Sequence, residues 1–281
     1  MSEPVHGAAG AEQGAADIGH MLKTHLENSP NLHLPGAHVQ LPHRLFGIDL
    51  SDVYGIDLSI TRDVVMMWVA ALFLVVVLAL TCRRRRMVPS GFLNVVESVV
   101  VFIRDEIAVP NIGKAQAGRF LPFLFTVFFF ILTCNLLGLI PYAATATGNI
   151  NVTAGLAICS FFTIQLAGVL HNGLFGYFKG LIPHGLPALL LPIMIPIEIV
   201  GLFTKPFALC IRLFANMTAG HVVILSLLGL IFLFNSIAIA PASVLFSVAV
   251  ELLEIFVAFI QAYIFTLLSA VFIGMAVHQE H

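Results

Sequence analysis

The stretch VVMMWVAALFLVVVLALT, residues 64–81, decides the fold, because it is an apolar run without a charged side chain. A helix needs about 20 such residues to cross the hydrocarbon core of a bilayer. Four arginines at 83–86 follow almost at once. Cytoplasmic flanks of spanning helices carry an excess of Lys and Arg. The sequence therefore predicts that residue 83 lies in the cytoplasm and that the N-terminal tail lies on the opposite side.

The overall composition agrees with a membrane protein. Of the 281 residues, 59% are hydrophobic and 10% are charged, whereas a soluble domain has about 25% charged residues. This balance excludes a water-soluble globule and predicts a polytopic membrane protein. The net charge of -2 gives no basic excess that would indicate nucleic-acid binding. The P-loop pattern GxxxxGK[ST] is absent from the sequence, so no nucleotide site is expected.

Two domains are expected, a polar tail at residues 1–60 and a membrane domain at residues 61–281. The tail is interrupted by prolines, which predicts loose order with one short helix near IGHMLKTHLEN, residues 18–28. Residues 90–108 carry apolar side chains at helical spacing, with charged side chains at other positions. This pattern predicts an amphipathic helix along the cytoplasmic interface. A buried packing helix is the alternative.

Further apolar regions predict about five membrane-embedded helices in all. Two simple spans are expected at residues 120–140 and 154–178. Two later regions, residues 186–233 and 242–277, exceed the 17–25 residues or so of a simple span. The first of them is either two short spans or one long, tilted helix with a broken start. An odd count of five spans would place the C-terminus in the cytoplasm.

Polar side chains inside the last two apolar regions are the candidates for function. Ionisable groups within membrane segments are rare, and they mark ion or proton pathways by default. The polar residues of these regions are Glu198, Lys205, Arg212, Asn216, His221, Glu251, Glu254 and Gln261.

The helical period groups the first of these residues on two faces. Asn216 follows Arg212 by four residues and shares its face, while Glu198 lies about 40° away from it on an ideal helix. His221 lies about 180° from Arg212 and faces the other side. An ion pair with a carboxylate is the structural alternative for Arg212. Lys205 has a simpler alternative, which is to extend its ammonium to the membrane surface.

The last apolar region carries a second polar stripe. Glu254 and Gln261 are seven residues apart and share a face, whereas Glu251 is offset from Gln261 by about 80°. Hydrogen bonding between helices is the structural alternative for this stripe.

A fixed cation beside titratable groups suggests a proton path. Arg212 stays charged at any relevant pH, so it cannot carry a proton. It can stabilise the anion of an approaching carboxyl group. Glu and His side chains can pass protons, because burial shifts their pKa values. Proton-accessible groups on opposite sides of Arg212 would form two separate access routes, with the cation blocking direct leakage between them.

The stretch KPFALCIRLFANMTAGH, residues 205–221, resembles the signature of subunit a of rotary F-type ATP synthases. PIMIPIEIVGLFTKP before it, CNLLGLIPY with NINVT, and EIFVAFIQAYIFTLLSAVFI near the end are also similar to this family. The resemblance covers about residues 62–277.

The resemblance implies a role for each polar position. Arg212 matches the essential arginine that faces the carboxylate of the rotating c-ring, and Asn216 matches an asparagine on the same face. Glu198 matches a glutamate lining an aqueous half-channel. Gln261 matches a glutamine near the arginine. The resemblance also implies that residues 186–277 form a tilted hairpin that wraps the c-ring.

Two departures from the family pattern concern the proton path. Many members have Glu at the position of His221 and His at that of Glu254, so the pair is exchanged in this chain. The exchange preserves a Glu–His relay if the two side chains adjoin, which the sequence leaves open. Asn149 stands where some members have an acidic residue, and Asn149 and Glu251 are further candidate site residues.

The expected function is that of the proton-conducting stator subunit of the FO motor, without catalysis or a cofactor in this chain. The expected partners are the c-ring, the peripheral-stalk b subunits, the whole F-type ATP synthase and the lipid bilayer, with no nucleic acid. The expected location is a bacterial inner membrane, and H⁺ is the expected ion. A secondary transporter would predict internal repeats, which the sequence does not suggest. A structural scaffold would not require Arg212.

Overall fold

The computed structural model describes residues 31–34, 37–40, 44–45, 48–49, 61–82, 91–140, 145–180, 191–234 and 240–278. The short helix predicted at residues 18–28 and the four arginines at 83–86 lie outside this part of the chain.

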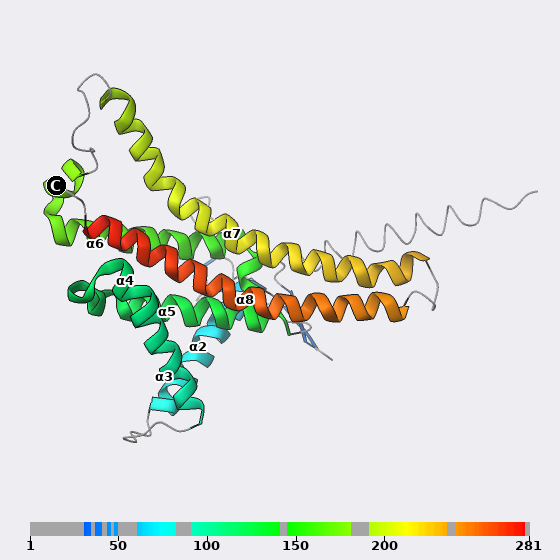
Figure 1. The fold of residues 1–281 in the computed structure, drawn as a ribbon. Coiled ribbons are helices and arrows are strands. Elements are labelled where there is room, and N and C mark those ends of the chain that lie inside the picture. The colour runs from blue at the N-terminus through cyan, green and yellow to red at the C-terminus, as the bar shows by residue number, and fades with distance from the viewer. Residues whose placement is uncertain are drawn as a thin grey trace, which may run out of the picture. The chain divides into compact units, whose positions relative to one another are not determined.

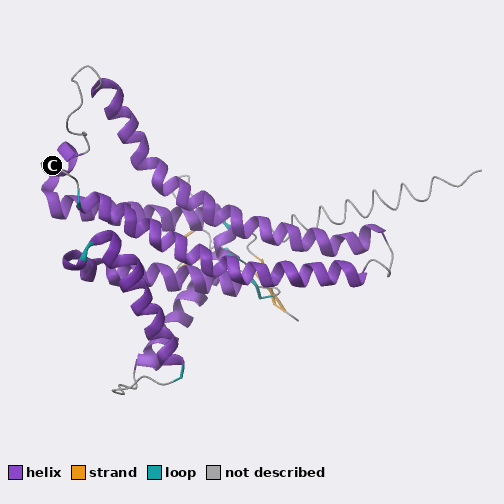
Figure 2. Ribbon diagram, viewed as in Figure 1, coloured by secondary structure: helices purple, strands orange, loops and turns teal. Residues whose placement is uncertain are grey.

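Every regular element described from residue 61 onwards is helical, which confirms the all-α polytopic fold (Figures 1 and 2). The elements are α2 (Arg62–Cys82), α3 (Phe92–Phe102), the π-helix η2 (Ile103–Ala108), α4 (Val109–Ile112), α5 (Lys114–Gly138), the 3₁₀ helix η3 (Ala146–Gly148), α6 (Ile150–Gly180), α7 (Leu191–Phe234) and α8 (Ala240–Val277).

Two short β-hairpins lie within the polar N-terminal tail. β1 (Asn31–Leu34) pairs antiparallel with β2 (Ala37–Gln40), and β3 (Arg44–Leu45) pairs antiparallel with β4 (Ile48–Asp49). The expectation of a loosely ordered tail did not include these hairpins. The residues between β1 and β2 in the sequence are Pro and Gly, a pair that favours turns.

Five helical segments of the described chain are long and apolar enough to cross a membrane, as the sequence predicts. They are Arg62–Thr81, Lys114–Gly138, Ile150–Gly173, Pro196–Ile231 and Ala240–Val277.

The helix α7 settles the choice that the sequence left open for residues 186–233. It is one helix of 44 residues that contains Pro196 and Pro206. At 1.5 Å per residue its length is about 66 Å, roughly twice the thickness of the hydrocarbon core. The region is therefore not two short spans. The tilt of α7 and α8 against a bilayer stays a prediction.

The chain consists of two compact units, which are described separately. Unit 1 comprises Met1–Ala70, Cys134–Asn149 and Phe214–Phe259, and unit 2 comprises Ala71–Thr133, Ile150–Leu213 and Ile260–His281.

The main hydrophobic core belongs to unit 2. It includes Leu124 and Ile131 of α5, Leu213 of α7, and Phe265 and Ile273 of α8, all of which are almost fully buried. At about 25 cal/mol for each Å² of apolar surface, burial of such side chains is the main stabilising contribution.

The predicted amphipathic helix corresponds to α3 and η2. No residue of α3 is buried, whereas Ile103 and Ile107 of η2 pack into the core of unit 2. On the exposed side of η2, Arg104 and Asp105 form an ion pair with a distance of 2.7 Å between Nε and Oδ1. The amphipathic character is therefore present, and the position along the membrane surface stays a prediction.

Candidate functional site

Arg212 and Asn216 lie on the exposed face of α7, four residues apart. The residues that directly follow them, Leu213 and Met217, are buried. The helical period thus directs one pair of side chains inward and the other outward. This arrangement agrees with the shared face predicted from the spacing.

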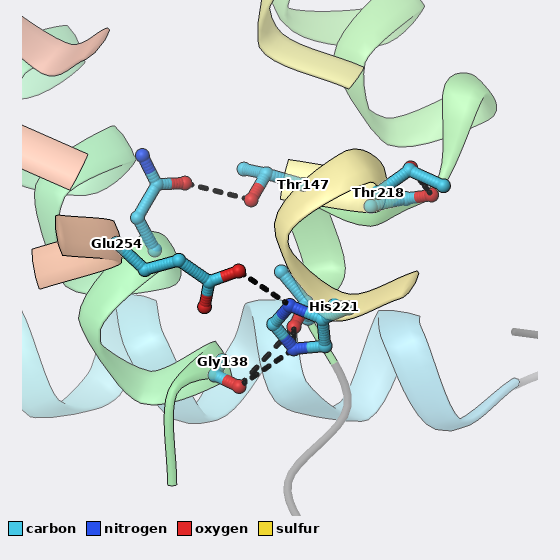
Figure 3. Close-up of polar contacts among 8 residues, drawn as sticks. Gly138, Thr147, Thr218, His221 and Glu254 are labelled. Atoms are coloured by element: carbon cyan, nitrogen blue, oxygen red, sulfur yellow. Dashed lines mark hydrogen bonds and ion pairs between the residues drawn. The ribbon is translucent and has the colours of Figure 1, made fainter. Parts of the chain in front are cut away.

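His221 and Glu254 are in contact within unit 1, which answers the question that the sequence left open. Nδ1 of His221 on α7 lies 3.7 Å from Oε1 of Glu254 on α8 (Figure 3). Glu254 is only 5% exposed. Burial of a carboxylate costs free energy unless a partner compensates its charge. His221 is the partner that can compensate the charge of Glu254.

The second ring nitrogen of His221 is held by two groups of unit 1. Nε2 lies 2.7 Å from Oγ1 of Thr145 and 3.2 Å from the carbonyl oxygen of Gly138. A carbonyl oxygen only accepts hydrogen bonds, so the bond to Gly138 requires a proton on Nε2. Nδ1 is then the nitrogen that can exchange a proton with Glu254.

Gly220 leaves the space beside α7 that the carboxylate of Glu254 fills. A methyl group at Gly220 would overlap Oε1 of Glu254. The absence of a side chain at Gly220 therefore allows the carboxylate to lie against the helix, next to His221. The sequence alone indicates no role for this glycine.

Further polar contacts extend from the His221–Glu254 pair through unit 1. Thr147 donates a hydrogen bond of 2.7 Å to Asn135, and both side chains are fully buried. Thr218 donates a bond of 3.4 Å to the carbonyl oxygen of Gly148, close to Thr147 in the chain (Figure 3). The loop around η3 thereby connects α5 with α7.

Asn149, a further candidate from the sequence, bonds to a buried carboxylate. Its Nδ2 donates a hydrogen bond of 2.7 Å to Oδ2 of Asp63, which is 6% exposed at the start of α2. Asp63 thus supplies a carboxylate next to the position where some family members are acidic. We define the polar cluster of unit 1 by Asp63, Asn135, Thr145, Thr147, Asn149, Thr218, His221 and Glu254.

Several buried atoms near this cluster have no hydrogen-bond partner among the described residues. They are Nδ2 of Asn135, Nδ1 of His221 and both carboxylate oxygens of Glu254. Buried polar groups in proteins are nearly always paired, and internal water commonly supplies the partner. These atoms are therefore the ones in the cluster that internal water would satisfy.

Sequence reasoning missed five members of the polar cluster because single polar residues near apolar runs do not reveal what they contact. They are Asp63, Asn135, Thr145, Thr147 and Thr218. Asp63 had a detectable signal, since it is a carboxylate that directly precedes the apolar run at residues 64–81.

Glu198 lies apart from this cluster along the chain and lines a cavity of unit 2. The cavity has a volume of about 260 Å³. Its polar lining comes from Gln165 and Tyr177 of α6, Glu198 and Lys205 of α7, and His278 after α8. Nζ of Lys205 lies 5.4 Å from the ring centre of Phe272. The cavity therefore holds a carboxylate and a cation from one face of α7.

The remaining candidates lie on α8. Gln261 is 1% exposed, and Glu254 is similarly buried seven residues earlier, which agrees with their predicted shared face. Glu251 is half-buried. Within the described part of the chain, no group of three or more His, Cys, Asp or Glu side chains is arranged to hold a metal ion.

Thr145→Val tests the support of His221. Valine has the shape of threonine but lacks the hydroxyl, so the ring loses one of its two partners at Nε2. We expect proton transport by the assembled complex to fall about two- to tenfold, the range of one hydrogen bond. Thr145→Ser retains the hydroxyl and is expected to stay close to the parent. Equal transport by the valine and serine variants would show that Thr145 does not orient His221.

Comparison with known proteins identifies the family. The sequence model of the family described as ATP synthase A chain matches residues 64–274. ATP synthase subunit a of Chloroherpeton thalassium is 55% identical over 236 residues, which cover 82% of this chain and 70% of that protein.

Two further relatives agree over similar or larger parts of the chain. ATP synthase subunit a of Myxococcus xanthus is 55% identical over 229 residues, covering 80% of this chain and 75% of that protein. ATP synthase subunit a 2 of Prosthecochloris aestuarii is 50% identical over 290 aligned positions, covering 100% of this chain and 87% of that protein. With a family match across its membrane-spanning helices, this chain belongs to the ATP synthase A chain family.

Proposed function

We propose that this chain is the proton-conducting stator subunit of the FO motor in a bacterial F-type ATP synthase. The observation that carries the proposal is the contact between His221 and Glu254. Placing two titratable side chains in a membrane-embedded region costs free energy. Such side chains mark proton pathways by default. Family membership supplies the context, and the contact supplies a pair of groups that can exchange a proton.

The polar cluster of unit 1 is proposed as one half-channel. Hydrogen bonds join Asp63 to Asn149, and His221 to Thr145 beside Glu254. Buried atoms of the same cluster that lack a hydrogen-bond partner can bind the water that links these groups. With the cytoplasmic side at residues 83–86, Asp63 at the start of α2 belongs to the outer surface. Protons thus enter the cluster from outside during ATP synthesis.

The cavity beside Glu198 is proposed as the other half-channel. Along α7, Arg212 follows Glu198 by fourteen residues and precedes His221 by nine. These separations correspond to about 21 Å and about 14 Å along an ideal helix. A permanent cation at that level separates the two titratable positions and opposes the direct passage of a proton between them.

Rotation of the partner c-ring connects the two half-channels in this proposal. A c-ring carboxylate takes up a proton from one half-channel, travels around in the lipid as a neutral acid, and releases the proton into the other. Arg212 keeps the returning carboxylate ionised, and Asn216 on α7 and Gln261 on α8 are proposed to assist it. Glu251 is proposed to line the path more peripherally. The peripheral-stalk b subunits hold this chain against rotation.

The catalytic chemistry belongs to other subunits in this proposal. This chain contributes no nucleotide site and no cofactor, and H⁺ is the ion it conducts. The chain crosses the inner membrane of a bacterium five times, with its N-terminus outside and its C-terminus in the cytoplasm.

Exchange of the two relay residues tests the proposal. His221→Glu places two carboxylates side by side, where one of them resists ionisation. Glu254→His places two imidazoles there. We expect each single variant to lower ATP-driven proton pumping in inverted vesicles at least about tenfold. The double variant restores one acid and one imidazole in contact, so we expect it to recover about tenfold over either single variant, within the coupling range of contacting residues.

Co-purification of the c-ring with each variant separates lost transport from lost assembly. A double variant no better than the poorer single variant, in a complex that is fully assembled, would refute a relay between these two positions.

A further inference from the structure

Two side chains of the unit 2 cavity, Gln165 and Tyr177, are not used by the half-channel as proposed above. Both line the same cavity as Glu198. Their arrangement depends on a break in α6, where Gly173 has φ 71° and ψ 164°. A residue with a side chain is strained at this positive φ, so glycine permits the chain to turn here.

The turn at Gly173 brings Tyr177 back onto its own helix. The ring of Tyr177 packs so closely on Gly168 that a methyl group there would overlap it. Tyr177 is 3% exposed. Asn172 adds a hydrogen bond of 3.0 Å from Nδ2 to the carbonyl oxygen of Ala276 at the end of α8. The ring of Tyr177 is therefore fixed in position at the cavity wall.

The hydroxyl of Tyr177 is hydrogen-bonded to the side-chain carbonyl of Gln165. It donates a hydrogen bond of 2.5 Å to Oε1 of Gln165. Burial raises the pKa of the Tyr177 hydroxyl, the bond to Gln165 lowers it less, and the nearby charge of Glu198 raises it again. The hydroxyl consequently remains a donor at physiological pH. With Oε1 turned toward Tyr177, the side-chain NH₂ of Gln165 points away from that hydroxyl and has two N–H groups to donate.

We propose that Tyr177 and Gln165 form a positioning pair that holds amide donors in the cavity of Glu198. This inference rests on the proposed function of the cavity as a half-channel. In this proposal the amide acts on the carboxylate of Glu198 through a water molecule in the cavity, and such donors favour the anion. Gln165 without Tyr177 is free to present its carbonyl instead, which would disfavour the anion.

The charged and titratable groups that face the cavity determine the expected pH response. They are Glu198 and Lys205 on α7, Tyr177 on α6 and His278 after α8. Lys205 stays in place over Phe272 when Tyr177 is changed, since its contact does not involve α6. Without these donors, the cavity stabilises the carboxylate less well. Release of the proton then slows, most strongly at acidic pH.

The test measures passive proton flux through FO across a pH series. Inverted vesicles carry the whole complex, the catalytic head is stripped off, and a potassium diffusion potential drives the flux. Tyr177→Phe retains the ring on Gly168 and removes only the hydroxyl. We expect flux at the acidic end to fall about two- to tenfold, with the midpoint of the pH profile moved to higher pH. Gln165→Leu is expected to behave in the same way.

The double variant and a matched tyrosine separate positioning from general damage. In this proposal the hydroxyl of Tyr177 affects proton flux through Gln165, so Tyr177→Phe combined with Gln165→Leu is expected to be no worse than Gln165→Leu alone. Tyr263 packs its ring near Phe102, with 5.9 Å between ring centres, and does not line the cavity. Tyr263→Phe is therefore expected to leave the pH profile unchanged.

Glu198→Gln in the same series distinguishes the two levels of the proposal. If Glu198→Gln lowers flux while Tyr177→Phe matches the parent at every pH, the positioning pair is refuted and the half-channel stands. Additive losses in the double variant would also refute the pair. If Glu198→Gln itself leaves flux unchanged, the cavity is not the half-channel and both proposals about it fail.

Discussion

Arg212→Ala is expected to abolish ATP-driven proton pumping while the complex stays assembled. The arginine lies on the exposed face of α7, among exposed apolar residues such as Phe207 and Ile211. A cation at such a position in a bilayer costs about 3 kcal/mol or more. In our proposal the passing c-ring carboxylates offset this cost, and removal of the cation removes the barrier between the half-channels.

The measurement is the quenching of a pH-sensitive dye in inverted vesicles, with co-purification of the c-ring as the check on assembly. We expect pumping at background and a passive proton leak through FO that persists. Arg212→Lys keeps the charge but not the planar guanidinium, so an intermediate value is expected. Normal pumping by the alanine variant would refute the proposed mechanism. The family match would then indicate only common ancestry with ATP synthase subunits.

Gly220→Ala is expected to produce the second largest loss. The added methyl group would overlap Oε1 of Glu254. The carboxylate must then move away from α7 and from His221, or the two helices must separate. Overpacking of this kind costs about 1–3 kcal/mol. We expect proton pumping to fall about tenfold, because the relay pair is broken although both of its members are still present.

A glycine elsewhere on α7 provides the matched control. A methyl group at Gly201 would meet no atom within 4 Å, so Gly201→Ala is expected to leave pumping unchanged. Shortening the carboxylate with Glu254→Asp in the Gly220→Ala background makes room for the methyl group and is expected to recover part of the activity. A Gly220→Ala variant that pumps as well as Gly201→Ala would show that the close contact does not matter for transport.

The predictions from sequence were most accurate where a property repeats along one helix. The apolar run at residues 64–81 predicted α2 to within two residues, because the energy of a spanning helix depends on local hydropathy. The shared face of Arg212 and Asn216 followed from the helical period alone. The exchange of His221 and Glu254 was visible as a departure from the family pattern.

Other features depended on packing between segments that are distant in sequence. The sequence did not decide whether residues 186–233 form one helix or two. A proline weakens a helix, but the helix can continue through it when other contacts compensate. The bond of Asn149 to Asp63 joins positions 86 residues apart. The return of Tyr177 onto Gly168 required knowledge of the backbone at Gly173.

The sequence by itself determined that this is a membrane protein with five apolar helical segments, and it determined which positions on α7 and α8 are polar. Both properties are local, since they follow from side-chain hydropathy and a period of 3.6 residues. Only the tertiary structure decided that Glu254 lies against Gly220 beside His221 and that Tyr177 engages Gln165. Such contacts depend on how closely backbones approach and which side chains share the space between them, which no single segment encodes.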